Sequence, residues 1–355
     1  MAAQERYRIN QQHCTAITNW RIKDMENKLV SLVVTCYNLQ DKIGRCLESL
    51  TSQTYPHLEI IVIDDGSKDG SFSVIQAAAS ADPRIRAVHQ ENAGVSASRN
   101  HGIDLATGEY LMFIDGDDYV ANTFVEHYIE VADGCDMVIG GMRMVYPDGQ
   151  EKAILQEIPF RCDIHTYVAE HYTRGVINRT LYGPVHKLFR TAVLQNNHVR
   201  FREELEIRED GIFVLDALVH CETLCGIEYA EYYYVQSPPG ASLVTKFHPN
   251  EKDINKLFND IQVSVIGREN MTAEHIRLFH TSLLSMDFGS IRKFYYSPDY
   301  SFMKGIRYIR SILKDNHFRK IRKELKAVDP GLARKYYRPV WMVHFVNLLA
   351  VKLKK

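Results

Sequence analysis

The segment around which this chain is organised is Glu109-Tyr110-Leu111-Met112-Phe113-Ile114-Asp115-Gly116-Asp117-Asp118-Tyr119. It begins as an apolar run of residues that favour β-strands and ends in a glycine-containing turn with three carboxylates. Hard divalent cations such as Mg²⁺ and Mn²⁺ prefer oxygen ligands and take one or two of them from protein carboxylates. Asp115 and Asp117 are spaced to share one such ion. A solvated acidic turn after a strand is the other interpretation, and the neighbouring segments decide between the two.

Strand-like and helix-like patterns alternate on the N-terminal side of this segment. Strand patterns occupy residues 29–38, 58–64 and 85–90, and helical patterns occupy residues 43–50, 72–80 and 96–106. This alternation predicts a doubly wound, mainly parallel α/β sheet of the Rossmann-like type, with right-handed crossovers. Ligands bind such sheets beyond the carboxyl ends of the strands.

Polar side chains follow three of the predicted strands at that edge. They are Thr35, Tyr37 and Asn38 after the first strand, Asp64 and Asp65 after the second, and Asp115, Asp117 and Asp118 after the fourth. A dinucleotide site is disfavoured, because the first strand continues into Thr-Cys-Tyr-Asn where a glycine-rich fingerprint would have to stand.

A candidate anion site lies between the third and fourth strands. Gly94 permits a tight turn there, and Ser96 is expected to cap the helix that follows. Free N–H groups at a helix start favour an anion, and Arg99 and Asn100 come one turn later, within reach of a phosphate or a sugar. An ordinary capped helix with a surface arginine is equally compatible with this pattern.

Four motifs together resemble the bacterial family 2 glycosyltransferases of the GT-A fold. They are Thr35-x-Tyr37-Asn38, Ile63-Asp64-Asp65-Gly66-Ser67-x-Asp69-Gly70-Ser71, Asn92-x-Gly94-x-x-x-x-Arg99-Asn100-x-Gly102 and Phe113-Ile114-Asp115-Gly116-Asp117-Asp118. Each motif is weak alone, but their order and separations are specific, and the resemblance covers residues 28–236. The chain departs from the family at Thr35, where the first strand often ends in proline.

The resemblance implies a nucleotide-sugar site, with a UDP-sugar as the expected donor. Thr35, Tyr37 and Asp65 would hold the nucleoside, with Asp65 accepting a hydrogen bond from the base. Asp115 and Asp117 would hold the sugar nucleotide through Mn²⁺ or Mg²⁺. The other donor contacts expected at this edge are Asn38, Gly94, Arg99, Asn100 and Gly116.

The resemblance also implies a catalytic base. Glu209 and Asp210 open an apolar helix, and locally the helix dipole is enough to explain two acids there. Inverting sugar transfer, however, needs a carboxylate that takes the proton of the acceptor hydroxyl. The family usually places that base in an acidic pair at this point of the chain. Asp210 is therefore expected as the base, and Glu209 would position Asp210 or the acceptor.

Four further residues are candidates on weaker grounds. His186 and Lys187 are expected to contact the diphosphate or the acceptor, although core or surface roles fit them as well. Ser242 lies in a loop that folds over the donor phosphates in similar proteins. His248 is a candidate third metal ligand, but a lone loop histidine is more often a surface residue.

We expect three regions along the chain. Residues 1–27 lack the apolar stretch of a signal peptide and are expected to form an arm without regular structure. Residues 28–245 would be the GT-A catalytic domain, and residues 246–355 a helical domain that is strongly basic from residue 303 on. The apolar residues 339–351 are too few to span a bilayer and suit a helix on a membrane surface. A core helix and half of an oligomer contact are the alternatives.

Composition sets wider limits on the protein. Its 355 residues carry a net charge of -1, which gives no argument for nucleic acid as a partner. The seven scattered cysteines contain no C-x-x-C pair and are expected to be reduced, as in the cytoplasm. Together with the membrane-surface tail, this predicts a cytoplasmic protein on the inner face of the cell membrane.

The predicted function is metal-dependent, inverting transfer of a sugar from a nucleotide sugar to a glycan or lipid-linked glycan. The product would be a bacterial surface polysaccharide or glycoconjugate. One rival is a sugar nucleotidyltransferase, which usually has a glycine-rich basic loop after the first strand, where this chain has Thr35 to Asn38. The other rival is a scaffold that binds a sugar nucleotide or glycan without catalysis, against which the full set of acids argues.

Overall fold

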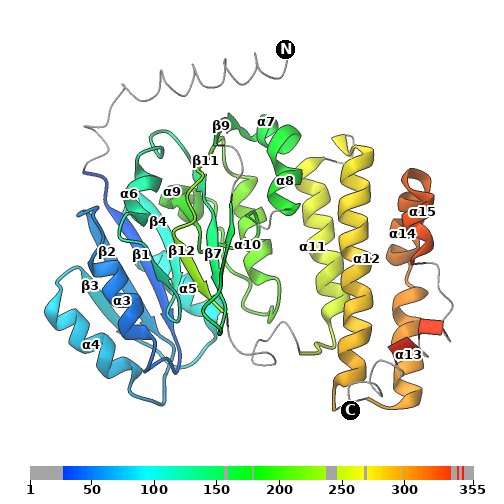
Figure 1. Ribbon diagram of the computed structural model, residues 1–355, viewed down its shortest axis with the longest axis horizontal. Helices are drawn as coiled ribbons and strands as arrows, with labels where there is room; N and C mark the ends of the chain where they lie inside the picture. Colours follow the sequence, from blue (N-terminus) through cyan, green and yellow to red (C-terminus); the bar gives the residue numbers. More distant parts are fainter. Residues whose placement is uncertain are drawn as a thin grey trace.

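The computed structural model describes residues 27–155, 159–177, 180–236, 246–267, 270–298, 300–336, 342–343 and 346–347. A large eight-stranded sheet forms its centre, with a smaller four-stranded sheet beside it. The C-terminal helices stand in a row at one side of the sheets (Figure 1). The expected arm, residues 1–27, lies outside the described residues except for Asn27.

The parallel half of the large sheet comes from the N-terminal part of the chain. Its strands are β1 (Val30–Cys36), β2 (Leu58–Asp64), β3 (Ile85–His89) and β4 (Tyr110–Asp115), and the helices between them are α3 (Ile43–Thr51), α4 (Ser71–Ala81) and α5 (Val95–Leu105). Strand β1 pairs in parallel with both β2 and β4, and all of its residues are buried. The prediction of a doubly wound, mainly parallel α/β sheet is confirmed.

The other half of the sheet is mixed in direction. Its strands are β6 (Met137–Ile139), β9 (Phe160–Asp163), β10 (Lys187–Arg190) and β11 (Thr223–Gly226), and its helices include α6 (Phe124–Ile129), α9 (Thr191–Asn196) and α10 (Glu209–Leu218). The full strand order is β3-β2-β1-β4-β10-β6-β11-β9, with β10 antiparallel to β4. Helix α10 packs on the sheet through Phe213, whose ring lies 5.5 Å from that of Phe113 between centroids. This packing brings the N-terminus of α10 to the edge where β4 ends.

The smaller sheet was not predicted. It consists of β5 (Tyr119–Val120), β12 (Tyr232–Val235), β7 (Met142–Val145) and β8 (Glu151–Ile154), in that order. Residues 136–146 do not form a single strand, because β6 and β7 belong to different sheets. Gly140 and Gly141 separate them, and their N–H groups donate to the carbonyls of His186 and Tyr229 at 3.1 and 2.8 Å. A side chain on Gly140 would overlap the ring of Tyr128, so the chain can change sheets only with glycine here.

The first C-terminal helices pack against the apolar core of the sheet, and the later ones form a second apolar core. The C-terminal helices are α11 (Glu251–Ile266), α12 (Ala273–Tyr296), α13 (Phe302–Leu313), α14 (Asn316–Val328) and α15 (Pro330–Arg334), while α7 (Ile164–Thr166), η1 (Tyr167–His171) and α8 (Tyr172–Ile177) lie earlier in the chain. Phe258 and Phe279 join the apolar core of the sheet, whereas the far side of α12 packs with α13 and α14 in a second cluster. The helical region is confirmed, and its division from the catalytic part at residue 245 stays a prediction.

The structure also bears on the expectations for the cysteines and for residues 339–351. Cys135 and Cys225 form a disulfide between the neighbouring strands β6 and β11, so the expectation that all seven cysteines are reduced is not met. Much of residues 339–351 lies outside the described residues, but Val343 is buried in the second cluster. Within the described parts of the chain, every helix is too short or too polar to cross a membrane.

Candidate active site

The ends of β1 and β4 lie side by side and build one wall of the site. Thr35 pairs with Asp115 in the register of the two strands. The Gly116 N–H donates to the Thr35 carbonyl at 2.9 Å, and a Cβ on Gly116 would come within 2.6 Å of that oxygen. Glycine is therefore required where the acidic turn crosses β1. Tyr37, at the tip of the same edge, is 47% exposed and presents its ring to solvent.

Asp65 holds the loop before α5 in place. Its carboxylate accepts hydrogen bonds from the N–H groups of Ala93 and Gly94, at 2.9 and 2.8 Å, and from Gln90 Nε2 at 2.9 Å. Gly94 has φ +92°, so this left-handed position favours glycine, and it is the N-cap of α5 in place of the expected Ser96. Any hydrogen bond from a base to Asp65 would share a carboxylate that is already engaged.

Asn38 and Asn100 also make protein contacts. Asn38 has φ +52°, and its Oδ1 accepts from the Lys68 N–H at 2.8 Å. Asn100 is buried and exchanges hydrogen bonds with the backbone of Phe201, at 2.9 and 2.8 Å. Asn100 therefore ties α5 to the chain that leads toward α10, and its expected contact with the donor stays a prediction.

Arg99 joins the two acidic groups of the site. Its Nη2 lies 2.8 Å from Asp115 Oδ1, and its Nη1 lies 2.6 Å from Asp210 Oδ1. Arg99 is 3% exposed, and its guanidinium lies over the Phe201 ring at 5.1 Å from the centroid. The structure thus brings together three predicted site residues from distant parts of the chain, and one buried guanidinium spans the gap between the two carboxylates.

Burial and charge alter the ionisation of this cluster. Burial raises the pKa of Asp210 above its ordinary value, the Arg99 cation opposes that rise, and Asp115 adds to it. Burial and the neighbouring Asp210 raise the pKa of Glu209 to about 7. Burial alone would lower the pKa of Arg99, but Asp210 and Asp115 raise it, so the guanidinium stays charged. A carboxylate with a raised pKa is a better proton acceptor than an ordinary aspartate, provided that it is ionised.

Helices α11 and α12 hold the residue that precedes this acidic pair. Arg208 has φ +64°, a strained conformation for a non-glycine residue, at the N-cap of α10. Its Nε donates to Asn255 Oδ1 at 2.8 Å, and Asn255 Nδ2 donates to Asp287 Oδ1 at 3.1 Å. The guanidinium also lies over the Phe258 ring. The sequence did not point to Arg208, because its contacts come from helices far along the chain.

The acidic turn contains two partly exposed carboxylates and one buried one. The side chains of Asp115 and Asp117 are 25% and 30% exposed, and a pair of carboxylates on one turn suits Mg²⁺ or Mn²⁺. Lys42 Nζ lies 3.4 Å from Asp117 Oδ2, a neighbour that the sequence did not indicate. Asp118 is buried and accepts from Tyr232 Oη and the Val235 N–H, both at 2.7 Å. Asp118 therefore anchors β12 beneath the turn.

The structure does not bring His248 to the acidic turn as a third metal ligand. Its Nδ1 lies 2.8 Å from Glu206 Oε2. Among the described residues, no three His, Cys, Asp or Glu side chains are grouped so that they could hold a metal ion. The expected set of Asp115, Asp117 and His248 is therefore not assembled, and the two aspartates alone fit an ion whose other ligands come from phosphates and water.

His186 and Lys187 are fully buried. Lys187 Nζ donates to the carbonyls of Thr180, at 2.8 Å, and Gly183, so its hydrogen bonds are made inside the protein. Burial lowers the pKa of Lys187 well below its ordinary value, although Asp210 opposes that shift. A direct phosphate contact from Lys187, as expected from the sequence, does not fit this position. Ser242 lies outside the described residues.

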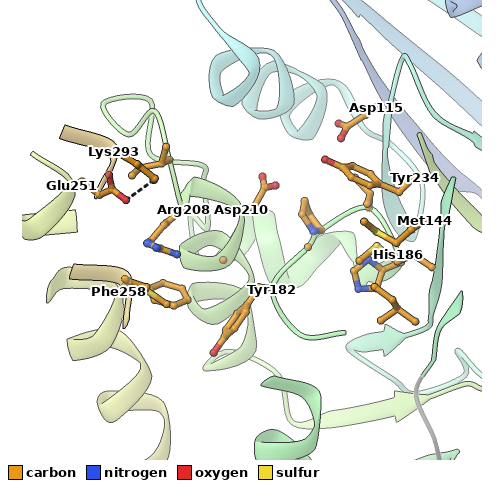
Figure 2. A pocket seen from close by; sticks show the side chains of 18 residues that line it. Asp115, Met144, Tyr182, His186, Arg208, Asp210, Tyr234, Glu251, Phe258 and Lys293 are labelled. Carbon is orange, nitrogen blue, oxygen red and sulfur yellow. Dashed lines mark hydrogen bonds and ion pairs between the residues drawn. The ribbon is translucent and has the colours of Figure 1, made fainter. Parts of the chain in front are cut away.

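A pocket of about 460 Å³ opens between the acidic cluster and the helical region. Figure 2 shows Asp115 and Asp210 at its upper part, with Tyr234 and Met144 on one side and Phe258 and Arg208 on the other. Glu251 is 1% exposed, and its Oε1 accepts a hydrogen bond from Lys293 Nζ at 2.7 Å. Its Oε2 is buried without a hydrogen-bond partner in the described structure. The lining is mostly apolar and aromatic, as in pockets that bind organic ligands.

Comparison with known proteins relates part of this chain to a known family. Residues 31–196 match the family model described as glycosyl transferase family 2. The matched segment, just under half of the chain, is therefore similar to that family. The chain is 30% identical over 212 residues to the uncharacterized glycosyltransferase EpsJ of Bacillus subtilis, covering 59% of this chain and 62% of EpsJ. It is 31% identical over 209 residues to the succinoglycan biosynthesis protein ExoO of Rhizobium meliloti, covering 58% of this chain and 59% of ExoO. The chain thus spans less than two thirds of these relatives.

Solved structures show that the fold of this protein extends into the helices. TarS 1–349 of S. aureus in complex with UDP-GlcNAc superposes with a TM-score of 0.66, at 20% sequence identity. The match covers 91% of this chain and 92% of that chain. The expected GT-A fold with a C-terminal helical region is therefore confirmed.

Proposed function

We propose that this protein is an inverting family 2 glycosyltransferase that moves a sugar from a nucleotide sugar to a glycan. The observation that carries the proposal is the bridge from Arg99 to both Asp115 and Asp210. It puts the carboxylate expected as the base next to the carboxylate expected to hold the donor. A scaffold that only binds sugar nucleotides would have no need of a second carboxylate with a raised pKa at this distance.

In the proposed reaction Asp210 takes the proton from an acceptor hydroxyl while the hydroxyl oxygen forms a bond to the anomeric carbon. The bond from that carbon to the diphosphate oxygen breaks, the electron pair leaves with the diphosphate, and the configuration inverts. Asp115 and Asp117 would hold Mn²⁺ or Mg²⁺, which when bound supplies positive charge to the departing diphosphate. Arg99 keeps Asp210 ionised and oriented, since its Nη1 bonds one oxygen of that carboxylate.

The nucleoside would lie along the β1 edge, by Thr35, Tyr37 and Asp65, and the acceptor would enter the pocket from the other side. Exposure of Tyr37 supports the first placement, because an aromatic ring can stack on a base. Aromatic and apolar walls beside Asp210 support the second, because sugars present C–H faces as well as hydroxyls. A UDP-sugar is the proposed donor, which agrees with the UDP-GlcNAc complex of TarS.

The pathway is inferred from relatives. A poly(ribitol-phosphate) beta-glucosyltransferase of Bacillus spizizenii is 27% identical over 228 residues, and ExoO takes its name from succinoglycan biosynthesis. Synthesis of a bacterial surface polysaccharide or glycoconjugate, in the cytoplasm and with a free or lipid-linked glycan as acceptor, is therefore part of the proposal.

Nucleotide release tests the proposal. The protein would be incubated with UDP-, GDP- and CMP-sugars, with Mn²⁺ and again with EDTA. We expect release from one donor that depends on the metal and is lost in Asp117→Ala, because one of the two carboxylates for the ion is gone. Asp216→Ala, which removes a carboxylate of α10 that is about one third exposed and pairs with Arg202, is the matched control and should keep activity. Release in EDTA, or by Asp117→Ala, at the rate of the wild type with Mn²⁺ would contradict the metal assignment.

A further inference from the structure

Helix α13 carries a basic face outside the proposed active site. Lys304, Arg307, Arg310 and Lys314 are all exposed, and at about 100° per residue their side chains fall within a third of the helix circumference. The opposite face packs through Ile309, Ile312 and Leu313 into the second apolar cluster. We call these four residues the α13 basic face. Its orientation away from the core means that all four charges point to solvent.

The nearby acidic side chains are engaged elsewhere. Between residues 300 and 336 the chain has only Asp315, Glu324 and Asp329 as acids. Asp315 caps α14 and pairs with Lys252, Glu324 lies 2.7 Å from His280 Nε2, and Asp329 caps α15. Within the described residues, none of the four cations of the α13 basic face lies within ion-pair distance of a carboxylate. Among the described residues, this concentrated positive charge therefore has no carboxylate as its counter-charge.

Large apolar side chains stand at the start of the same helix. Met303 is 58% exposed and, by the helical angle, falls among the four cations, while Phe302 is 55% exposed one residue earlier. Helix α14 extends the positive surface with the exposed Arg319 and Lys323. Figure 1 places α13 and α14 on the outer side of α12, at the end of the molecule that is farthest from β3.

We propose that the α13 basic face is a docking surface for an anionic lipid bilayer. Basic side chains are attracted to the negative surface of such a membrane, and an exposed apolar side chain such as Met303 can enter the boundary between headgroups and acyl chains. A soluble polyanion would satisfy the four cations but would offer no apolar phase to Met303. The proposal concerns α13 and goes beyond the proposed reaction. It concerns α13 and not residues 339–351, which come later in the chain.

Sedimentation with vesicles tests the proposal on the full chain. We expect the protein to sediment with vesicles of phosphatidylcholine mixed with phosphatidylglycerol, to release at high salt, and to ignore pure phosphatidylcholine. Arg307→Glu with Arg310→Glu should weaken this binding by about tenfold or more, because two attractive charges become repulsive. Met303→Ser should weaken it to a smaller extent. Both positions are exposed, and unchanged circular dichroism and melting would show that the variants are folded.

The matched control reverses two exposed charges on the catalytic part, Arg86→Glu with Lys152→Glu. It makes the same change in net charge and should bind anionic vesicles as the wild type does. Absence of binding to anionic vesicles, or an equal loss in the control, would overturn the proposal. So would binding of inorganic polyphosphate that competes fully with the vesicles while Met303→Ser has no effect, since the partner would then be a soluble polyanion.

Discussion

Arg99 is the residue on which the electrostatics of the site depend. It faces Asp115 and Asp210 at once and is itself almost fully buried, so its charge acts at short range in a medium of low polarity. A side chain that only contacted donor phosphates would have no reason to bond the second carboxylate. The motif Arg99-Asn100 predicted a polar residue near the donor, but its link to Asp210 depends on the packing of α10 against β4.

Replacement of Arg99 should shift the pH dependence of activity. Asp210 must be ionised to act as a base, and Arg99 lowers its pKa against the effects of burial and Asp115. In Arg99→Met that pKa should rise further, so the acidic limb of kcat/KM should move to higher pH and activity at neutral pH should fall. Arg99→Lys keeps the charge and should show a smaller shift. The rate of nucleotide release measured as a function of pH gives the shift for each variant. An acidic limb in Arg99→Met at the same pH as in the wild type would contradict this role of Arg99.

A second prediction concerns the support of Arg208. Asn255 is fully buried and links Arg208 to Asp287, so Asn255→Leu should destabilise the protein by about 1–3 kcal/mol and lower turnover more than donor binding. Asn259, one turn further along α11, has a buried Oδ1 with no hydrogen-bond partner in the described structure. Asn259→Leu should therefore be close to neutral. Urea unfolding measures the stability of both variants. An equal loss of stability in Asn255→Leu and Asn259→Leu would show that the hydrogen bond from Arg208 to Asn255 does not stabilise the protein.

Among single residues, the sequence predicted those whose role is fixed by a local motif. Asp115, Asp117 and Gly116 follow directly from a strand that ends in an acidic turn, and their neighbourhood with Thr35 follows from parallel pairing. For Lys187 and His248 the sequence left structural roles open beside the functional ones, because their contacts depend on loops that no local pattern describes. A buried lysine whose hydrogen bonds go to backbone carbonyls looks the same in sequence as one that binds phosphate.

At the scale of elements, the closest fit is between α5 and β1. A Cβ on Gly102 would come within 2.1 Å of Val33 Cγ1, so helix and strand approach each other only with glycine. Gly102→Ala should cost about 1–3 kcal/mol in stability and loosen the helix that carries Arg99.

Gly289 is the matched control for Gly102. It also lies in a helix, α12, but a Cβ there would meet nothing within 4 Å. Gly289→Ala should raise stability by about 0.5–1 kcal/mol, because alanine is the better helix former. In thermal or urea unfolding, Gly102→Ala should lower the free energy of unfolding and Gly289→Ala should raise it. If both variants were destabilised, packing against Val33 would not be the cause of the loss in Gly102→Ala.

The elements that the sequence predicted well are those with a strong periodic pattern and a local end signal. Strands β1, β2 and β4 are continuous apolar runs, and helix α3 has a clear apolar face through Ile43, Leu47 and Leu50. The smaller sheet escaped prediction because its strands are short and half-buried, and β12 lies between β5 and β7 only through contacts across the chain. The hydrogen bond from Tyr232 Oη to Asp118 is one such contact, because it joins residues that are 114 positions apart.

At the scale of the whole molecule, the helical region belongs to the site as well as to the surface. Helices α11 and α12 line the pocket beside Asp210 through Phe258, Glu251 and Lys293, while α13 forms the outer edge. Sequence periodicity indicated helices here, but it could not show that their first two complete a pocket against the sheet. Their residues lie outside the matched family segment, so they are the natural place for acceptor selectivity to differ among relatives.

The central claim is that Asp210 is the base of an inverting transfer, and one variant tests it most directly. Asp210→Asn keeps the shape of the side chain and removes its ability to accept the proton. With the donor found in the release assay, calorimetric titration should show donor binding close to that of the wild type, while transfer should fall by about a hundredfold or more. Transfer at the wild-type rate by Asp210→Asn would contradict the account.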